Sequence, residues 1–190
     1  MDYIINTFIN YYESIFRHIP IQVFQIVLCA VLISVVLIIY FKGLKRCREG
    51  VALSLLLGYI FLLVCYTVIF RIEGKHTGVA LLPFWSYMSY YEGTDSILLG
   101  ENIMNVVAFV PVGFLLAMAR RHMSLRGTLI IGGLLSAGIE VAQIVFKRGL
   151  CETDDVIHNV LGCLLGYMIV KLPSLYLGKY FRKAYGSLRG

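Results

Sequence analysis

The chain has 190 residues, a length that fits a single domain, and 59% of them are hydrophobic while only 15% are charged. With a mean hydropathy of +0.80, this composition excludes an ordinary soluble globular protein. The formal net charge of +6 would suit nucleic acid as a partner, but the basic residues flank long apolar runs, where lysine and arginine set membrane orientation. The composition therefore predicts an integral membrane protein that binds no nucleic acid.

Residues 1–19 alternate aromatic and polar side chains and lack a basic leader region, so we expect an interfacial amphipathic helix, not a signal peptide. The alternative is a frayed first turn of the next helix. Pro20 suits the first turn of a spanning helix that is charge-free over 21–41 and long enough to cross about 30 Å of hydrocarbon. Four further apolar runs complete a predicted all-α bundle of five spans; they are 51–70, 103–119, 128–146 and 156–172.

Two prolines and one polar stretch modify this bundle. Pro111, followed by Gly113, predicts a kink in the third span, and Pro173 is expected to end the fifth. Residues 72–101 are moderately polar and contain several glycine breakers, with an amphipathic patch around Trp85. Because tryptophan and tyrosine favour membrane interfaces, the patch predicts an interfacial or a re-entrant segment; a re-entrant backbone would have to be covered by protein.

Lysine and arginine are distributed unevenly between the two ends of the predicted bundle. The first connection, the third connection and the C-terminal end of the chain from Lys171 onward hold twelve of the seventeen basic residues. The other five lie in the N-terminal segment and in the second and fourth connections. Since basic residues favour the cytoplasmic side, we expect the N-terminus outside and the C-terminus inside. The connection between the fourth and fifth spans then faces the outer leaflet.

The tightest cluster of ionisable side chains lies at that fourth connection. Glu140 and Gln143 are three residues apart, so a helix places both on one face near the outer end of the fourth span. Ionisable groups inside a membrane are costly, which makes the cluster a functional-site hypothesis by default. The predicted topology brings polar residues of other spans to the same level. The predicted binding residues are Asn102, Asn105, Glu140, Gln143, Arg148, Asp154, Asp155, His158 and Asn159.

Several of these residues also have a purely structural interpretation. The two aspartates would cap a helix N-terminus and complement its dipole, and Asn159 would serve close helix packing. Arg148, taken alone, would be a charge at the rim of the bundle at headgroup depth. His158 would be a hydrogen-bonded histidine at a helix interface and not a metal ligand. Glu140 is the hardest to explain structurally, because nothing in a packed span requires a carboxylate. A charged side chain at the bilayer centre costs about 2.5–3.5 kcal/mol on insertion scales.

The residue types in this cluster argue against several classes of function. No His-Glu-x-x-His or comparable pattern appears, and the five cysteines contain no Cys-x-x-Cys pair, so we expect neither a metal site nor a disulfide framework. A hydrolase needs a nucleophile or an activated water, and no serine or cysteine adjoins a clear base. The chain has five short spans and no internal repeat, which argues against a transporter. The residues favour a small outer-leaflet pocket that holds a headgroup without a cofactor.

Five sequence pieces occur in a recognisable order. They are TVIFR at 67–71, LLPF at 81–84, NIMNVVAFVPVGFLL at 102–116, E-x-x-Q at 140–143 and RGLCETDDVIHNVLGCLLGY at 148–167. Together they resemble the VanZ-like family of bacterial membrane proteins, which is named after a teicoplanin-resistance determinant. One departure is Ala80, where the family often has an asparagine, so a polar contact is expected to be missing there.

The resemblance implies a protein of the bacterial cytoplasmic membrane, associated with lowered susceptibility to teicoplanin and related glycopeptides. It divides the chain into an interfacial helix (1–19), the first span and most of the second (20–66), a family-like core (67–173) and a basic cytoplasmic tail (174–190). The expected partner is a membrane lipid, a lipid-linked envelope precursor or a lipoglycopeptide. The alternative is a hydrolase or transferase that modifies such a precursor, and we favour binding over catalysis.

Overall fold

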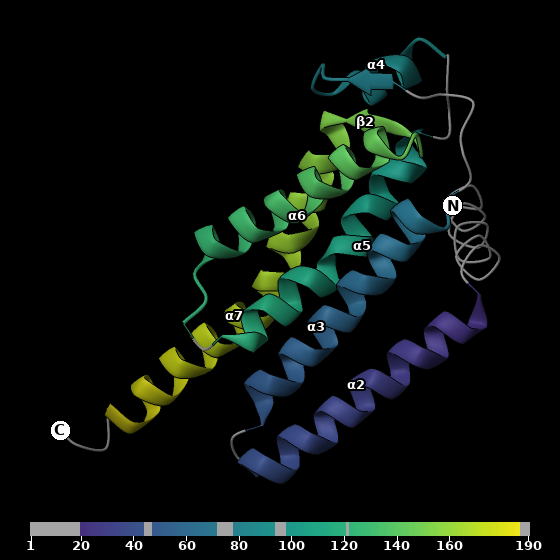
Figure 1. Cartoon of the computed structure of the whole chain (residues 1–190). Coiled ribbons are helices and arrows are strands. Elements are labelled where there is room, and N and C mark those ends of the chain that lie inside the picture. Colours follow the sequence, from purple (N-terminus) through teal and green to yellow (C-terminus); the bar gives the residue numbers. More distant parts are fainter. Residues whose placement is uncertain (1–19, 44–46, 72–77, 94–97, 121, 187–190) are drawn as a thin grey trace.

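The structure is a computed structural model that describes residues 20–43, 47–71, 78–93, 98–120 and 122–186 (Figure 1). The interfacial helix predicted for residues 1–19 lies outside this part of the chain. The described helices are α2 (Ile21–Lys42), α3 (Arg48–Val64), the π-helical turn η2 (Cys65–Ile69), α4 (Trp85–Tyr91), α5 (Leu98–Ala119), α6 (Leu125–Val145) and α7 (Thr153–Gly186).

Five helices are long and apolar enough to cross a membrane. They are α2, α3 continued through η2, α5, α6 and the first part of α7, and the mean hydropathy of these candidate spans ranges from 2.9 down to 1.5. Within the described residues, the number and order of these candidate spans agree with the prediction. α6 begins three residues before the predicted 128, because the Ser124 hydroxyl accepts a hydrogen bond from the Gly127 N–H at 3.0 Å and caps the helix.

The fifth candidate span ends at Pro173, as predicted, but the helix that contains it does not. Pro173 lies inside α7, which continues to Gly186 and so includes most of the predicted tail. Pro111 likewise lies inside α5. A proline removes one backbone donor from a helix but does not forbid its continuation, particularly in membrane helices, where neighbouring groups compensate for the freed carbonyl.

The centre of the bundle is the pair α5 and α7, which cross with their backbones in close contact (Figure 1). A Cβ built on Gly113 of α5 would lie only 2.0 Å from the carbonyl oxygen of Cys163, and one on Gly166 of α7 would lie 2.0 Å from that of Val110. Such distances exclude any side chain, so the glycines allow an approach that drives association in lipid through backbone packing.

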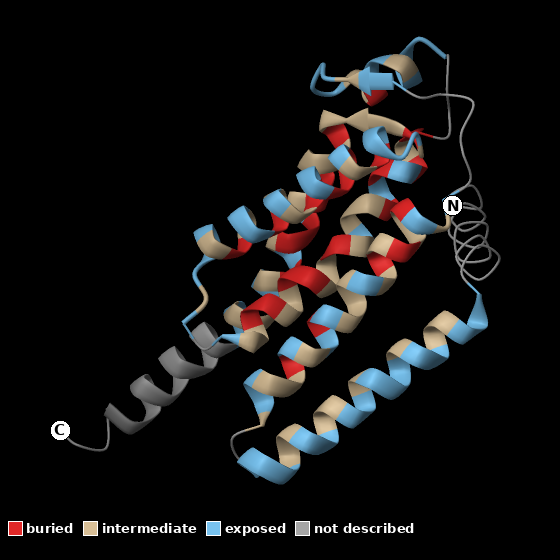
Figure 2. Cartoon of the chain, in the orientation of Figure 1, coloured by how far each residue is buried: buried red, intermediate tan, exposed pale blue. Residues whose placement is uncertain are grey.

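The other helices surround this pair. α3 packs on α5, α6 packs on α7, and residues of both complete the apolar core. Among the described elements, α2 makes extensive contact only with α3. None of its residues is buried (Figure 2). The buried core residues are Leu56, Leu63, Val68, Phe109, Val112, Leu116, Ile139 and Cys163.

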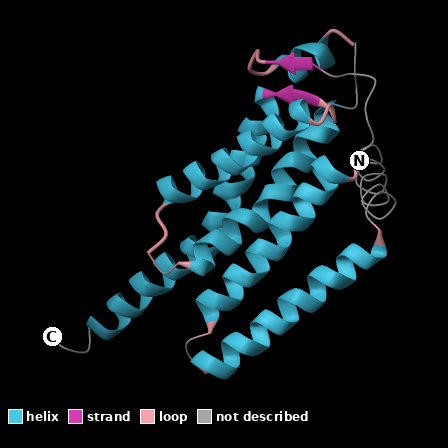
Figure 3. Cartoon of the chain, viewed as in Figure 1, coloured by secondary structure: helices cyan, strands magenta, loops and turns pink. Residues whose placement is uncertain are grey.

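The all-α expectation needs one correction. β1 (Gly78–Ala80) and β2 (Leu150–Glu152) form a two-stranded parallel pair at one end of the bundle (Figure 3). Strands of three residues are too short to show the alternation of polar and apolar side chains by which strands are recognised in a sequence. The pair ties the connection between η2 and α4 to the connection between α6 and α7.

The segment 78–93 lies across the end of the bundle and does not enter between the spans (Figure 1). Its short helix α4 is half-buried along one side, where Ser86 is fully buried, and exposed along the other. This position matches the interfacial alternative for the Trp85 patch and not the re-entrant one. The segment therefore acts as a cover over the polar end of the helices.

Substitution of Gly166 tests the α5–α7 contact. We expect Gly166→Ala to destabilise the protein by about 1–3 kcal/mol or more, because the new methyl group overlaps backbone that cannot move easily. Thermal unfolding in detergent measures the effect. Gly138→Ala on α6 is the matched control, since its Cβ would meet nothing within 4 Å, and its melting temperature should stay equal or rise. Equal behaviour of the two variants would contradict the close approach.

Two cysteines at opposite ends of the bundle test the predicted orientation. Cys47 precedes α3 and Cys151 lies in β2, and both are partly exposed. A membrane-impermeant thiol reagent should label Cys151 in intact cells and leave Cys47 unmodified until the membrane is opened. Burial and the nearby carboxylates Glu140, Asp155 and Glu152 raise the pKa of the Cys151 thiol, so labelling should accelerate with pH. Labelling of Cys47 in intact cells would reverse the topology.

Candidate functional site

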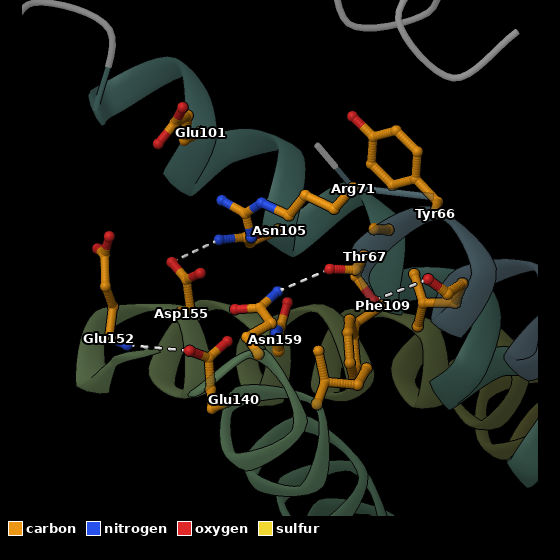
Figure 4. A pocket seen from close by; sticks show the side chains of 14 residues that line it. Tyr66, Thr67, Arg71, Glu101, Asn105, Phe109, Glu140, Glu152, Asp155 and Asn159 are labelled. Atoms are coloured by element: carbon orange, nitrogen blue, oxygen red, sulfur yellow. Dashed lines mark hydrogen bonds between the residues drawn. The ribbon is translucent and has the colours of Figure 1, made fainter. Parts of the chain in front are cut away.

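A cavity of about 300 Å³ opens at the end of the bundle where α3, α5, α6 and α7 meet below the strand pair. We call it the polar pocket. Its wall combines apolar side chains with carboxyl and amide groups from α5, α6, β2 and α7 and with the guanidinium group of Arg71 (Figure 4). The lining residues are Leu63, Tyr66, Thr67, Arg71, Glu101, Asn105, Ala108, Phe109, Ile139, Glu140, Gln143, Glu152, Asp155 and Asn159.

Two helix faces supply the inner wall. Glu140 and Gln143 are three residues apart on α6, and Asp155 and Asn159 are four apart on α7, so each pair shares one face. The two faces meet because the Asn159 amide donates a hydrogen bond to the hydroxyl of Ser136, one turn before Glu140, at 2.9 Å. The sequence prediction that these residues share one site is consistent with this geometry.

The π-helical turn η2 supplies the third side of the pocket. A π-turn inserts one extra residue into a helix and changes which carbonyl groups are free to accept hydrogen bonds. The Gln143 amide donates to the Thr67 carbonyl at 3.2 Å, and the Arg148 guanidinium donates to the Ile69 carbonyl at 3.0 Å and to the Arg71 carbonyl. Arg148 thus fastens the α6–β2 connection to the end of η2, and it does not line the pocket.

Two carboxylates are held in place by neighbouring donors. Glu140 is 4% exposed, and its Oε2 accepts a hydrogen bond from the backbone N–H of Glu152 at 2.9 Å. The Asp155 Oδ1 accepts from the side-chain amide of Asn105 on α5 at 2.7 Å (Figure 4). These bonds fix the orientation of each carboxyl group, and both residues line the cavity.

Two buried acceptors in the pocket wall have no hydrogen-bond partner among the described residues. They are the Gln143 Oε1 and the Asn159 Oδ1, on side chains that are 2% and 5% exposed. Leaving a buried polar atom unsatisfied costs about 1–3 kcal/mol, and such atoms in a native structure need an explanation. Both atoms belong to residues that line the pocket, so a donor inside the pocket would satisfy them.

Arg71 is the basic residue of the pocket, and Gly149 makes room for it. Its side chain extends from the end of η2 toward Asn105 and the carboxyl groups (Figure 4). A Cβ on Gly149 would lie 2.9 Å from the Cζ of Arg71, and its φ of +153° also disfavours other residues. The sequence analysis missed Arg71 as a site residue, although it ends the TVIFR motif and is the charge that closes the second span.

Three predicted binding residues hold α4 in place and do not line the pocket. The Asp154 carboxylate accepts hydrogen bonds from the backbone N–H groups of Phe84 and Ser86 and from the Ser86 hydroxyl, so it caps α4 and not its own helix. Asn102 donates to the same hydroxyl at 2.9 Å. His158 bridges the Asp154 carbonyl oxygen at 2.6 Å and the Tyr87 hydroxyl at 2.7 Å.

Of the nine predicted residues, the pocket therefore contains Asn105, Glu140, Gln143, Asp155 and Asn159. Glu101 and Glu152 also line it and were missed. Each is adjacent to a polar residue of a motif, but nothing in the sequence distinguishes a carboxylate that faces a cavity from one that faces solvent at a helix end.

Glu152 lies in β2, outside the spans, and its protonation is sensitive to its surroundings. Burial first, and then the carboxylates of Glu101 and Glu140, raise its pKa from an ordinary 4.5 to about 7. Opposite Glu152 in the strand register is Ala80, the position at which the family often has an asparagine. No group of three or more histidine, cysteine or acidic residues in the described part of the chain is arranged to hold a metal ion.

The Glu152 pKa predicts a pH dependence of stability. Because the folded protein holds the Glu152 proton to about pH 7, this residue stabilises the fold at low pH, and that contribution is lost as pH rises from 4.5 through 7. Glu152→Gln cannot lose a proton. Its melting temperature should match the parent near about pH 4.5 and exceed it near about pH 8, as measured by thermal unfolding in detergent. A constant difference at all pH values would contradict the shift.

Comparison with known proteins agrees with the motifs. A family model described as VanZ/LLP1 matches residues 51–175, which leaves α2 outside the match. The chain is 29% identical over 79 residues to Protein VanZ of Enterococcus faecium, covering 42% of this chain and 49% of that protein. It thus spans about half the length of this curated relative, and no solved structure matches it. Because the family model covers more than half of its residues, the chain belongs to the VanZ/LLP1 family of multi-span membrane proteins.

Proposed function

We propose that the polar pocket binds the polar headgroup of an envelope lipid or of a lipid-linked wall precursor at the outer leaflet. The observation that carries the proposal is the pair of unsatisfied buried acceptors, Gln143 Oε1 and Asn159 Oδ1, in the wall of a cavity at the end of a membrane bundle. Ionisable and amide groups concentrated at one end of otherwise apolar spans mark a functional site.

The size of the pocket supports a headgroup as the occupant. Its volume of about 300 Å³ is at the lower end of the range for small-molecule sites. A lipid would place its polar end in the pocket and its chains along the apolar outer surface of the bundle. That surface includes large exposed side chains on α6, such as Ile130, Leu134 and Val141.

The family association with teicoplanin susceptibility fits the same proposal. Lipoglycopeptides act at the outer face of the membrane on lipid-linked wall precursors, and a protein that holds such a precursor or the lipid-anchored part of the drug would change its availability. The predicted orientation, with the connection between α6 and α7 outside, brings the pocket to that leaflet.

A second candidate is an enzyme that modifies a lipid-linked precursor. The observation that favours it is Glu152, whose pKa of about 7 suits a general acid or base at physiological pH, next to Glu140. A hydrolase or transferase would use one carboxyl group to accept a proton from water or from a substrate hydroxyl. Binding remains the first proposal, because the pocket holds no serine or cysteine nucleophile among its lining residues.

The double variant E140Q/D155N tests the proposed binding. Each amide can still accept the hydrogen bond that its carboxylate accepts, from the Glu152 N–H and from Asn105, so the fold should be retained. We expect the lipids that co-purify with the full-length protein to decrease at least about ten-fold, as measured by mass spectrometry.

The control is Glu49→Gln, which removes one exposed carboxylate from the first turn of α3, away from the pocket. It should retain the lipids of the parent. If E140Q/D155N is correctly inserted and keeps full lipid binding and any glycopeptide resistance of the parent, binding and catalysis at this pocket both fail. Release of a labelled product from a lipid-linked precursor by the purified protein would replace binding with catalysis.

A further inference from the structure

The inner wall of the polar pocket is built almost entirely of acceptors. Glu101, Glu140, Glu152 and Asp155 each contribute a carboxyl group, and the amide oxygens of Gln143 and Asn159 are buried without donors. One N–H group of each amide is bonded, that of Gln143 to the Thr67 carbonyl and that of Asn159 to the Ser136 hydroxyl. The two unsatisfied amide oxygens therefore require donors from an occupant, and a phosphodiester group, which has only acceptors, does not supply them.

Two kinds of donor could reach this wall: neutral hydroxyl groups and a charged ammonium group. The carboxyl groups of the wall favour the charged one. Hydroxyl groups of a sugar or of glycerol would satisfy the amide oxygens but would bring no positive charge to Glu140 and Asp155. Buried charges of one sign are stable only when they are paired or neutralised. A primary ammonium brings one positive charge and three N–H donors in a compact group, which matches two amide oxygens and one carboxylate oxygen.

The pocket also contains a positively charged side chain, that of Arg71. Arg71 reaches in from the end of η2 over Gly149, and its positive charge lies close enough to act on the carboxyl groups of Glu140 and Asp155. Guanidinium groups bind phosphate oxygens in a bidentate manner. The pocket thus places an anion-binding group beside an acceptor-rich wall.

We infer that the polar pocket is a specific site for a zwitterionic lipid headgroup that carries a primary amine, with the ammonium against Glu140, Asp155, Gln143 and Asn159 and the phosphate beside Arg71. The inference rests on the proposed function and adds the chemical class of the ligand. It also predicts that a quaternary ammonium is a poor ligand, since it has no N–H to donate to the two amide oxygens.

Three short-chain lipids that differ only in the headgroup test this inference on the full-length protein in detergent. They are phosphatidylethanolamine, phosphatidylglycerol and phosphatidylcholine, and native mass spectrometry measures their binding. We expect the ethanolamine lipid to bind at least about ten-fold more tightly than the other two, because only it satisfies both the charge and the donor requirement. Free phosphoethanolamine should compete with it less effectively than unlabelled lipid if a membrane lipid is the source of the amine.

Variants separate the roles of the two sides. E140Q/D155N should abolish the preference for the ethanolamine lipid, whereas Arg71→Gln should weaken all three lipids by a similar factor because all three share the phosphate. Glu92→Gln, which alters an exposed carboxylate at the end of α4, should change neither result. The melting temperature of each variant is measured first, so that a loss of binding is not confused with unfolding.

The outcomes distinguish this inference from the proposed function. If the three lipids bind equally and E140Q/D155N weakens all of them, the pocket binds headgroups but does not select an amine, and only the inference is overturned. If the ethanolamine preference persists in E140Q/D155N, the amine binds elsewhere and the inference is again overturned. If none of the three lipids binds the parent protein, the inference fails, and the lipid co-purification experiment decides the proposed function by itself.

Discussion

The bundle depends on the direct backbone contact between α5 and α7. Gly113, Gly162 and Gly166 allow this contact, and a side chain at any of the three would collide with a backbone carbonyl oxygen of the other helix. In lipid, apolar side chains gain little by leaving a solvent that is equally apolar, so close packing of this kind must hold helices together. The same contact sets Asn105 of α5 opposite Asp155 of α7, and it therefore also sets the width of the polar pocket.

Much of the architecture was predictable because membrane spans can be recognised in a sequence by their length and hydropathy. The five spans and their order follow from apolar runs, and the shared face of Glu140 and Gln143 follows from helical spacing. The continuation of α7 past Pro173 was not predictable, because the cost of a proline depends on neighbouring groups that satisfy the freed carbonyl. The strand pair was not predictable either, since three residues carry no readable periodicity.

The candidate site was predicted less completely than the fold. Asp154 and Asp155 are adjacent and chemically identical, yet one caps α4 and the other faces the pocket, because consecutive helical residues point in directions about 100° apart. Arg148 was expected in the pocket but binds backbone carbonyls, and Arg71, for which no binding role was predicted, lines the pocket. Such choices depend on how the connections fold over the bundle end, which is a tertiary property that spacing along the chain does not encode.

The π-helical turn η2 has a consequence for how related chains diverge. A π-turn is equivalent to a single-residue insertion, and an α-helix rotates by about 100° per residue. Loss of one residue from Cys65–Ile69 would rewind the turn and rotate everything after it, including Arg71, away from the cavity while leaving α3 unchanged. A one-codon deletion at this point would thus move the positive charge out of the pocket, and because the core residue Val68 lies in the same turn, the bundle would have to repack around the shortened helix.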